Sequence, residues 1–165
     1  MAPDSPAPLS RRAWLGQAAL GALALVAARR LPAAPPPAKP VMVVYKDPQC
    51  GCCTKWNDHM KAAGFTLQVR DTADLATVKA SVGVPSRLQS CHTALIGGYF
   101  VEGHVPADLV AKLLREKPAI AGLAVPGMPA GSPGMEGPPP ERYEVVAVGR
   151  DGRTSVYAVR VGGAA

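Results

Sequence analysis

The chain has 165 residues, of which 48% are hydrophobic, and this suffices for one domain with a proper core. Its 18 prolines and 17 glycines predict many loops. Half of the net charge of +6 lies in residues 1–34, which hold four arginines and one aspartate; the rest has 14 basic and 11 acidic residues. Because no basic cluster remains and aromatic residues are few, composition argues against nucleic-acid binding.

The amino-terminal segment has the pattern of an export signal. Twin arginines, Arg11 and Arg12, precede an apolar run of 14 residues from Leu15 to Ala28, as in Tat signals. This run is shorter than the roughly 20 residues that span a bilayer. We therefore expect a Tat-type signal segment at 1–34, a proline-rich linker at 35–40, and a periplasmic protein with no membrane span after cleavage. An uncleaved anchor is the alternative.

From residue 41 onward, hydrophobic spacing predicts an α/β fold. The apolar, β-branched run Val41–Tyr45 is typical of a buried strand, and Gly97-Gly98 joins two short apolar runs as a hairpin turn would. We expect strands at 41–45, 65–69, 93–96 and 99–102, and helices that begin near Cys53, at Asp71 or Thr72, and at Pro106. The order β-α-β-α-β-β-α, with a cysteine motif at the first strand–helix turn, predicts a thioredoxin-like mixed sheet flanked by helices.

The remainder of the chain is expected to be a loop-rich extension. Residues 122–140 form a long run of turn residues, and long ordered loops are usually functional. Tyr143–Val148 and Thr154–Val161 are expected to form a terminal β-hairpin. The domain prediction is thus a thioredoxin-like metal-binding domain at 41–118, with an extension at 119–165 packed on it.

All four cysteines belong to the candidate site: Cys50, Cys52 and Cys53 near the first helix, and Cys91 before the third strand. Cys50 and Cys53 have the spacing of a disulfide oxidoreductase, and a helix amino terminus lowers the pKa of a thiol. Cys52, however, adds a third thiol that simple disulfide exchange does not need. Because the expected topology brings Cys91 to the same edge of the sheet, four thiolates favour a soft metal.

Copper is the metal that this spacing favours. Adjacent thiolates such as Cys52 and Cys53 point in different directions, which suits several bridged Cu(I) ions better than chelation of one. Zinc in a four-cysteine site is the alternative, although zinc ligands are usually spaced further apart. His92, Met128 and Met135 are candidates for further ligands or for groups that hydrogen-bond a ligand. We expect His59 to be a packing or surface residue and His104 to be a helix-entry residue.

Four separated motifs resemble the CopG copper-resistance family of periplasmic metal-binding proteins. They are the C-x-C-C run at 45–56, Ser90-Cys-His-Thr93, Gly103-His-Val-Pro106, and the methionine- and glycine-rich stretch 122–135. The resemblance covers about residues 41–160. It implies a thioredoxin-like domain with a carboxy-terminal extension, copper bound by Cys50, Cys52, Cys53 and Cys91, and a role in copper resistance through Cu(I)/Cu(II) interconversion.

The leading hypothesis is therefore an exported protein that holds Cu(I) on four thiolates, as one ion or a multinuclear cluster, for copper resistance or homeostasis. A copper efflux or redox protein would be its partner. One alternative is a periplasmic thiol–disulfide oxidoreductase that uses Cys50 and Cys53. Another is a copper chaperone that transfers the ion without catalysis. No catalytic residue is assigned, and an enzymatic role would be that of a copper or thiol–disulfide oxidoreductase.

Overall fold

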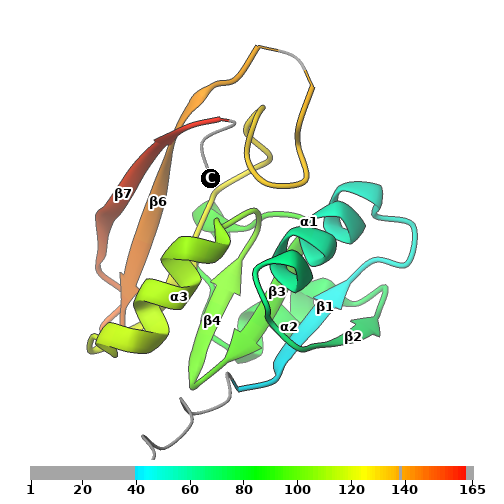
Figure 1. Ribbon diagram of the computed structural model, residues 1–165. Coiled ribbons are helices and arrows are strands. Elements are labelled where there is room, and N and C mark those ends of the chain that lie inside the picture. The colour runs from blue at the N-terminus through cyan, green and yellow to red at the C-terminus, as the bar shows by residue number, and fades with distance from the viewer. Residues whose placement is uncertain (1–39, 138, 163–165) are drawn as a thin grey trace, which may run out of the picture. The chain divides into compact units, whose positions relative to one another are not determined.

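The computed structural model describes residues 40–137 and 139–162, so the expected signal segment 1–34 and the linker 35–40, except Pro40, lie outside it. One mixed sheet of seven strands organises this part of the chain (Figure 1). The elements are, in chain order, β1 Met42–Lys46, α1 Gly51–Ala62, β2 Leu67–Asp71, α2 Leu75–Ser81, a 3₁₀ turn Ser86–Leu88, β3 His92–Ile96, β4 Tyr99–Glu102, α3 Ala107–Glu116, β5 Ile120–Ala124, β6 Arg142–Gly149 and β7 Thr154–Val161.

The strand order is β2-β1-β3-β4-β5-β6-β7. β1 is parallel to β2 and antiparallel to β3, and β3 turns back into β4 as a hairpin. The predicted thioredoxin-like α/β fold is therefore confirmed over its first four strands and three helices. β5 then pairs parallel to β4, and the terminal hairpin of β6 and β7 continues the sheet in antiparallel fashion.

Helices α1 and α3 cover one face of the sheet, and α2 lies on the other (Figure 1). The apolar stripes of the two helices on the first face, with Trp56 and Met60 on α1 and Val110 and Leu113 on α3, are fully buried in the main core. The alternation of β1 places Met42 and Val44 in the same core. Among residues 40–137 and 139–162, no helix is long and apolar enough to cross a membrane.

The expected start of the second helix was wrong by a few residues. Asp74 is the N-cap of α2, and its carboxylate accepts a hydrogen bond from the Thr77 N–H at 3.1 Å. Asp71 instead ends β2, where it pairs with Lys46 of β1. The β2 strand thus runs two residues beyond its predicted end, because pairing with β1 continues past the apolar alternation.

Strand β5 was also missed, because the loop-rich prediction began inside it. Its pattern Ile-Ala-Gly-Leu-Ala is too short and too glycine-containing to predict a strand alone. Gly122 is required there, since a Cβ at this position would collide with the carbonyl oxygen and ring of Phe100 on β4. Pairing on both sides, with β4 and β6, makes this segment a strand.

Candidate metal centre

The turn between β1 and α1 presents three of the four cysteines. Cys50 is the N-cap of α1, and its sulfur accepts the Cys53 N–H at 3.4 Å. The preceding turn is closed by a hydrogen bond from the Cys50 N–H to the Asp47 carbonyl at 3.0 Å. Cys50 and Cys53 form a disulfide. The structure therefore presents the oxidised form of the C-x-x-C pair at a helix amino terminus, the location typical of redox-active cysteines.

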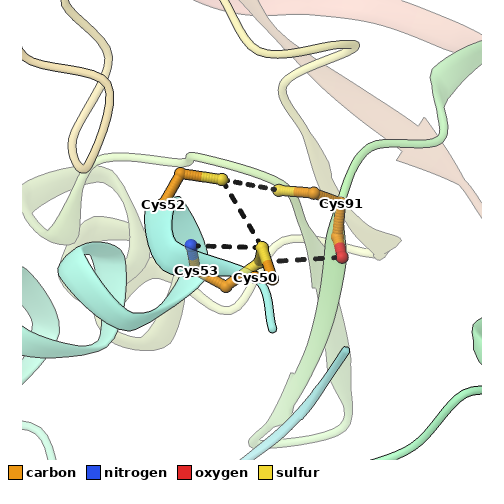
Figure 2. A group of neighbouring side chains, drawn as sticks. All are labelled: Cys50, Cys52, Cys53 and Cys91. Carbon is orange, nitrogen blue, oxygen red and sulfur yellow. Dashed lines mark hydrogen bonds between the residues drawn. A yellow bond between two sulfur atoms is a disulfide. The ribbon is translucent and has the colours of Figure 1, made fainter. Parts of the chain in front are cut away.

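Cys52 and Cys91 remain free thiols, and they face each other across the gap between α1 and the start of β3 (Figure 2). Their sulfur atoms are 3.8 Å apart. Cys52 Sγ also lies 3.5 Å from Cys50 Sγ, and Cys53 Sγ lies 3.8 Å from the Cys91 carbonyl oxygen. The expectation that Cys91 faces the motif on α1 agrees with this geometry, and all four sulfurs lie within 4.8 Å of one another.

His104 joins the cysteine group from the turn after β4. Its side chain is fully buried, and its Nε2 lies 3.0 Å from Cys91 Sγ. Its Nδ1 lies 2.7 Å from the carbonyl oxygen of Pro133, which only accepts hydrogen bonds, so Nδ1 carries the proton and Nε2 presents a lone pair to the sulfur. This is the orientation that metal-binding histidines usually have. The sequence pattern favoured a helix-entry residue at His104 over a ligand, so its position beside Cys91 was not expected.

His92 contacts the same sulfur and lies beside His104, with the two ring centroids 5.2 Å apart. Its Nδ1 is 3.4 Å from Cys91 Sγ, and its ring packs on Trp56 with a centroid distance of 4.4 Å. The ring is fully buried, and its Nε2 has no hydrogen-bond partner among the described residues. Burial lowers its pKa well below the usual range, and nearby His104 and the ammonium groups of Lys79 and Lys46 lower it further. His92 therefore stays neutral and contacts a candidate ligand.

Burial also controls the protonation of Cys91 and His104. Removal from water raises the pKa of Cys91 to about 12, with a further contribution from neighbouring Cys52. Burial lowers the pKa of His104, against smaller opposing effects of Pro133 and Glu136. Near neutral pH, the Cys91 thiol is therefore protonated and the imidazole is neutral. A soft cation that displaces this proton would gain a thiolate and an imidazole at once.

The two methionine candidates come from the loop after β5. Met128 is 53% exposed, and its Sδ lies 4.0 Å from Cys52 Sγ. Met135 is half-buried and lines a hollow of about 330 Å³ beside the cysteine motif. The hollow is formed by Gly51, Cys52, Lys55, Ala130, Gly134, Met135 and Glu136. The structure thus brings Met128 to the sulfur group, while Met135 lies along an open approach to Cys52.

The loop is attached closely to the residues beside the cysteines. Ser90 Oγ donates a hydrogen bond to the Gly127 carbonyl, and the Val125 N–H donates to the Glu102 carbonyl at 3.0 Å. At Gly134, whose φ is +90°, a Cβ would lie 2.7 Å from the Cys52 carbonyl oxygen. The absence of a side chain at Gly134 therefore allows the loop backbone to lie directly against α1.

His59 is not part of the site. It is half-buried on α1, and its Nε2 accepts the Ala107 N–H of α3 at 3.1 Å. The ring thus satisfies one of the free N–H groups at the start of α3. This contact fits the expectation of a packing residue.

Fold and site together define a thioredoxin-like protein whose redox motif is enlarged by two further cysteines and a buried histidine. Two solved structures, titled "Copper resistance protein copG- Form 1" and "Form 2", each match at 46% identity and a TM-score of 0.71. They cover 75% and 74% of this chain and 99% and 98% of their own. The chain therefore belongs to the family of copper resistance protein CopG.

Two further comparisons complete this result. A family model described as "Protein of unknown function, DUF411" matches residues 88–135, the segment that contains both Cys91 and Met135. No curated protein sequence matches the chain significantly.

Proposed function

We propose that the protein binds copper as Cu(I) in its reduced form, with Cys50, Cys52, Cys53 and Cys91 as thiolate ligands. The observation that carries this proposal is the position of Cys52, whose sulfur lies 3.5 to 4.0 Å from those of Cys50, Cys91 and Met128. Two thiolates on one tetrahedral ion, at a metal–sulfur distance of about 2.3 Å, lie about 3.8 Å apart. The separation of Cys52 and Cys91 equals that value.

The chemistry of the donor set favours copper over zinc. Thiolates and an imidazole also bind zinc, but a thioether such as that of Met128 is a soft ligand that suits Cu(I) and is not among the Cys, His, Asp and Glu side chains that usually bind zinc. Because Cys52 lies close to three other sulfurs, it is suited to bridge ions, and the proposal includes a multinuclear cluster. His104 is an additional ligand in this proposal, since its Nε2 lone pair faces Cys91. We propose a role in copper resistance, as in the titles of the related structures, and a periplasmic location.

The deciding experiment is anaerobic copper loading of the reduced protein, with copper counted per chain and sulfur ligation read by X-ray absorption. We expect at least one Cu(I) per chain and copper–sulfur scattering. Cys52→Ser and Cys91→Ser should each remove most of this binding. Thr54→Ser, an exposed position on the same helix turn, is the matched control and should bind normally. Failure of the parent protein to bind stoichiometric copper would refute the proposal.

A redox function is the second candidate, and the Cys50–Cys53 disulfide favours it. Oxidation of two thiols to a disulfide releases two electrons and two protons. These electrons suffice to reduce two Cu(II) ions to Cu(I), and the reverse reaction would oxidise two Cu(I). Disulfide exchange with a protein substrate would use the same pair. Insulin reduction abolished by Cys50→Ser, in protein that binds no copper, would favour the oxidoreductase alternative over the copper-binding proposal.

A copper chaperone is the third candidate, with an efflux or redox protein as the recipient. The hollow beside Cys52 supports an exchange route, since it leaves one side of the motif open. Transfer of Cu(I) to a competing chelator without any change in oxidation state or thiol count would favour this role. A change in the oxidation state of copper together with a change in the thiol count during transfer would favour redox interconversion.

A further inference from the structure

Helix α2 packs on the sheet in an unusual way. The only fully buried side chain of this helix belongs to a lysine, Lys79, which is 4% exposed. Its ammonium lies 2.5 Å from the Oε1 of Glu102, which is 0% exposed, and 2.9 Å from the Thr93 hydroxyl. Burying an ion pair costs desolvation of both charges, which apolar residues of similar volume would not incur. The core of this helix therefore contains a polar network that fold stability alone does not require.

The carboxylate of Glu102 makes contacts on both sides of Cys91. Its Oε1 accepts the Ser90 N–H at 2.6 Å, and its Oε2 accepts the Thr93 hydroxyl at 2.6 Å. These two residues bracket Cys91 and His92 in the chain. Thr93 and Glu102 are directly opposite each other on β3 and β4, so this contact follows from the strand register.

The backbone of Glu102 adds a connection to the extension. Its carbonyl accepts the Val125 N–H at 3.0 Å, at the start of the segment that leads to Met128. The next residue, Gly103, has a φ of +69°, and a Cβ there would lie 2.6 Å from both Ser90 and the Val125 carbonyl oxygen. Residues 102–103 therefore contact both Ser90, which precedes Cys91, and Val125, which begins the segment leading to Met128.

We propose that Glu102, held by Lys79, is a positioning residue that fixes the Ser90–Cys91 backbone so that the Cys91 sulfur faces Cys52. This inference rests on the proposed copper site for its functional meaning. The carboxylate touches no candidate ligand atom and acts only through the backbone and Thr93. Outer hydrogen bonds of this kind typically change metal affinity by about 10- to 100-fold when removed.

Two double variants separate positioning from simple stability. Lys79→Met with Glu102→Leu removes both charges and the acceptor for the Ser90 N–H, while the apolar pair keeps the core filled. Lys79→Met with Glu102→Gln also removes both charges but retains an amide oxygen as acceptor. We expect the first variant to bind Cu(I) about tenfold or more weakly, and the second to retain near-parental affinity. Leu113→Ala, a change in the fully buried core on α3, is the stability control.

A second measurement addresses the geometry without copper. In the metal-free oxidised protein, only Cys52 and Cys91 are free to react, so their alkylation by iodoacetamide is followed by peptide mapping. The double variant with Glu102→Leu should accelerate alkylation of Cys91 severalfold and leave Cys52 unchanged. Unchanged Cys91 reactivity, or parental Cu(I) affinity in this variant, would overturn the inference. A parental protein that binds no copper would instead refute the proposed function, while the alkylation result would still decide the role of Glu102.

Discussion

The Nε2 of His104 lies 3.0 Å from the Sγ of Cys91, and the other nitrogen of the same ring is hydrogen-bonded to the Pro133 carbonyl. One ring thus connects the cysteine that precedes β3 to the loop that carries the methionines. The orientation of the imidazole depends on the extension, so the extension is part of the site even where it contributes no sulfur.

His104→Gln should weaken Cu(I) binding by about tenfold or more, because the Gln side chain lacks an imidazole lone pair at this position. Competition with a Cu(I) chelator measures the affinity. His59→Gln is the matched control: it changes a histidine whose Nε2 accepts the Ala107 N–H, a contact that an amide oxygen can also make. Equal affinity of His104→Gln and the parent would exclude His104 as a ligand.

The oxidation state of the Cys50–Cys53 pair should set the copper capacity. With the disulfide closed, two of the four thiols cannot ligate, so the air-oxidised protein should bind less copper per chain than anaerobically reduced protein. Metal analysis together with a thiol count checks this. In a Cys50→Ser/Cys53→Ser variant, addition of reductant should leave the copper ratio unchanged. The same ratio in both forms of the parent protein would contradict the prediction.

Gly103→Ala should reduce both stability and copper affinity. A left-handed backbone costs an alanine about 1–3 kcal/mol, and the new Cβ would also displace Ser90 and the Val125 carbonyl. Urea denaturation and Cu(I) competition measure the two effects. Gly98→Ala is the matched control, because Gly98 also has a positive φ, +84°, with open space around a Cβ. It should lose stability without losing affinity, and a parallel loss of affinity would contradict the prediction.

Stability should fall as pH decreases from about 7.5 to 5. All three histidines of the chain have pKa values lowered in the folded state, in each case mainly by burial. Below about pH 6.5 the unfolded chain therefore takes up protons that the folded chain resists, which favours unfolding. Each histidine can change the free energy of unfolding by up to about 1.4 kcal/mol per pH unit.

Denaturant unfolding of the metal-free protein at several pH values measures this dependence. The histidine effect is expected between about pH 7.5 and 5, above the range in which most carboxylates titrate. His59→Gln should make the slope shallower, because one titrating group is removed. A free energy of unfolding that is constant or increases toward pH 5 would contradict the prediction.

The parts of the molecule that the sequence predicts well are those encoded by nearby residues. The β1 strand, the cysteine turn and the β3–β4 hairpin follow from local apolar spacing and turn residues. β5 could not be predicted in this way, since Gly122 belongs to a strand only because Phe100 and β6 lie beside it. The position of His104 beside Cys91 could not be predicted in this way either, because its two partners, Cys91 and Pro133, are 13 and 29 residues away in the chain.

The four cysteines could be recognised as a group from the sequence because three are nearly adjacent and the topology places the fourth. Whether Cys50 and Cys53 are bonded could not be decided, since their spacing suits a disulfide and a metal equally. The Lys79–Glu102 ion pair could not be predicted from the sequence either, because a lysine in a short helix is normally expected to be exposed.

The contact between Cys52 and Met128 joins residues separated by 76 positions in the chain. A disordered polypeptide would bring such distant donors together only rarely, since the entropy of closing so large a loop opposes it. Copper bound by this set should therefore stabilise the native state selectively, by mass action. A chain that is still unfolded when it meets copper would complete this donor set only after it has folded, whereas a chain that folds first presents the whole set at once.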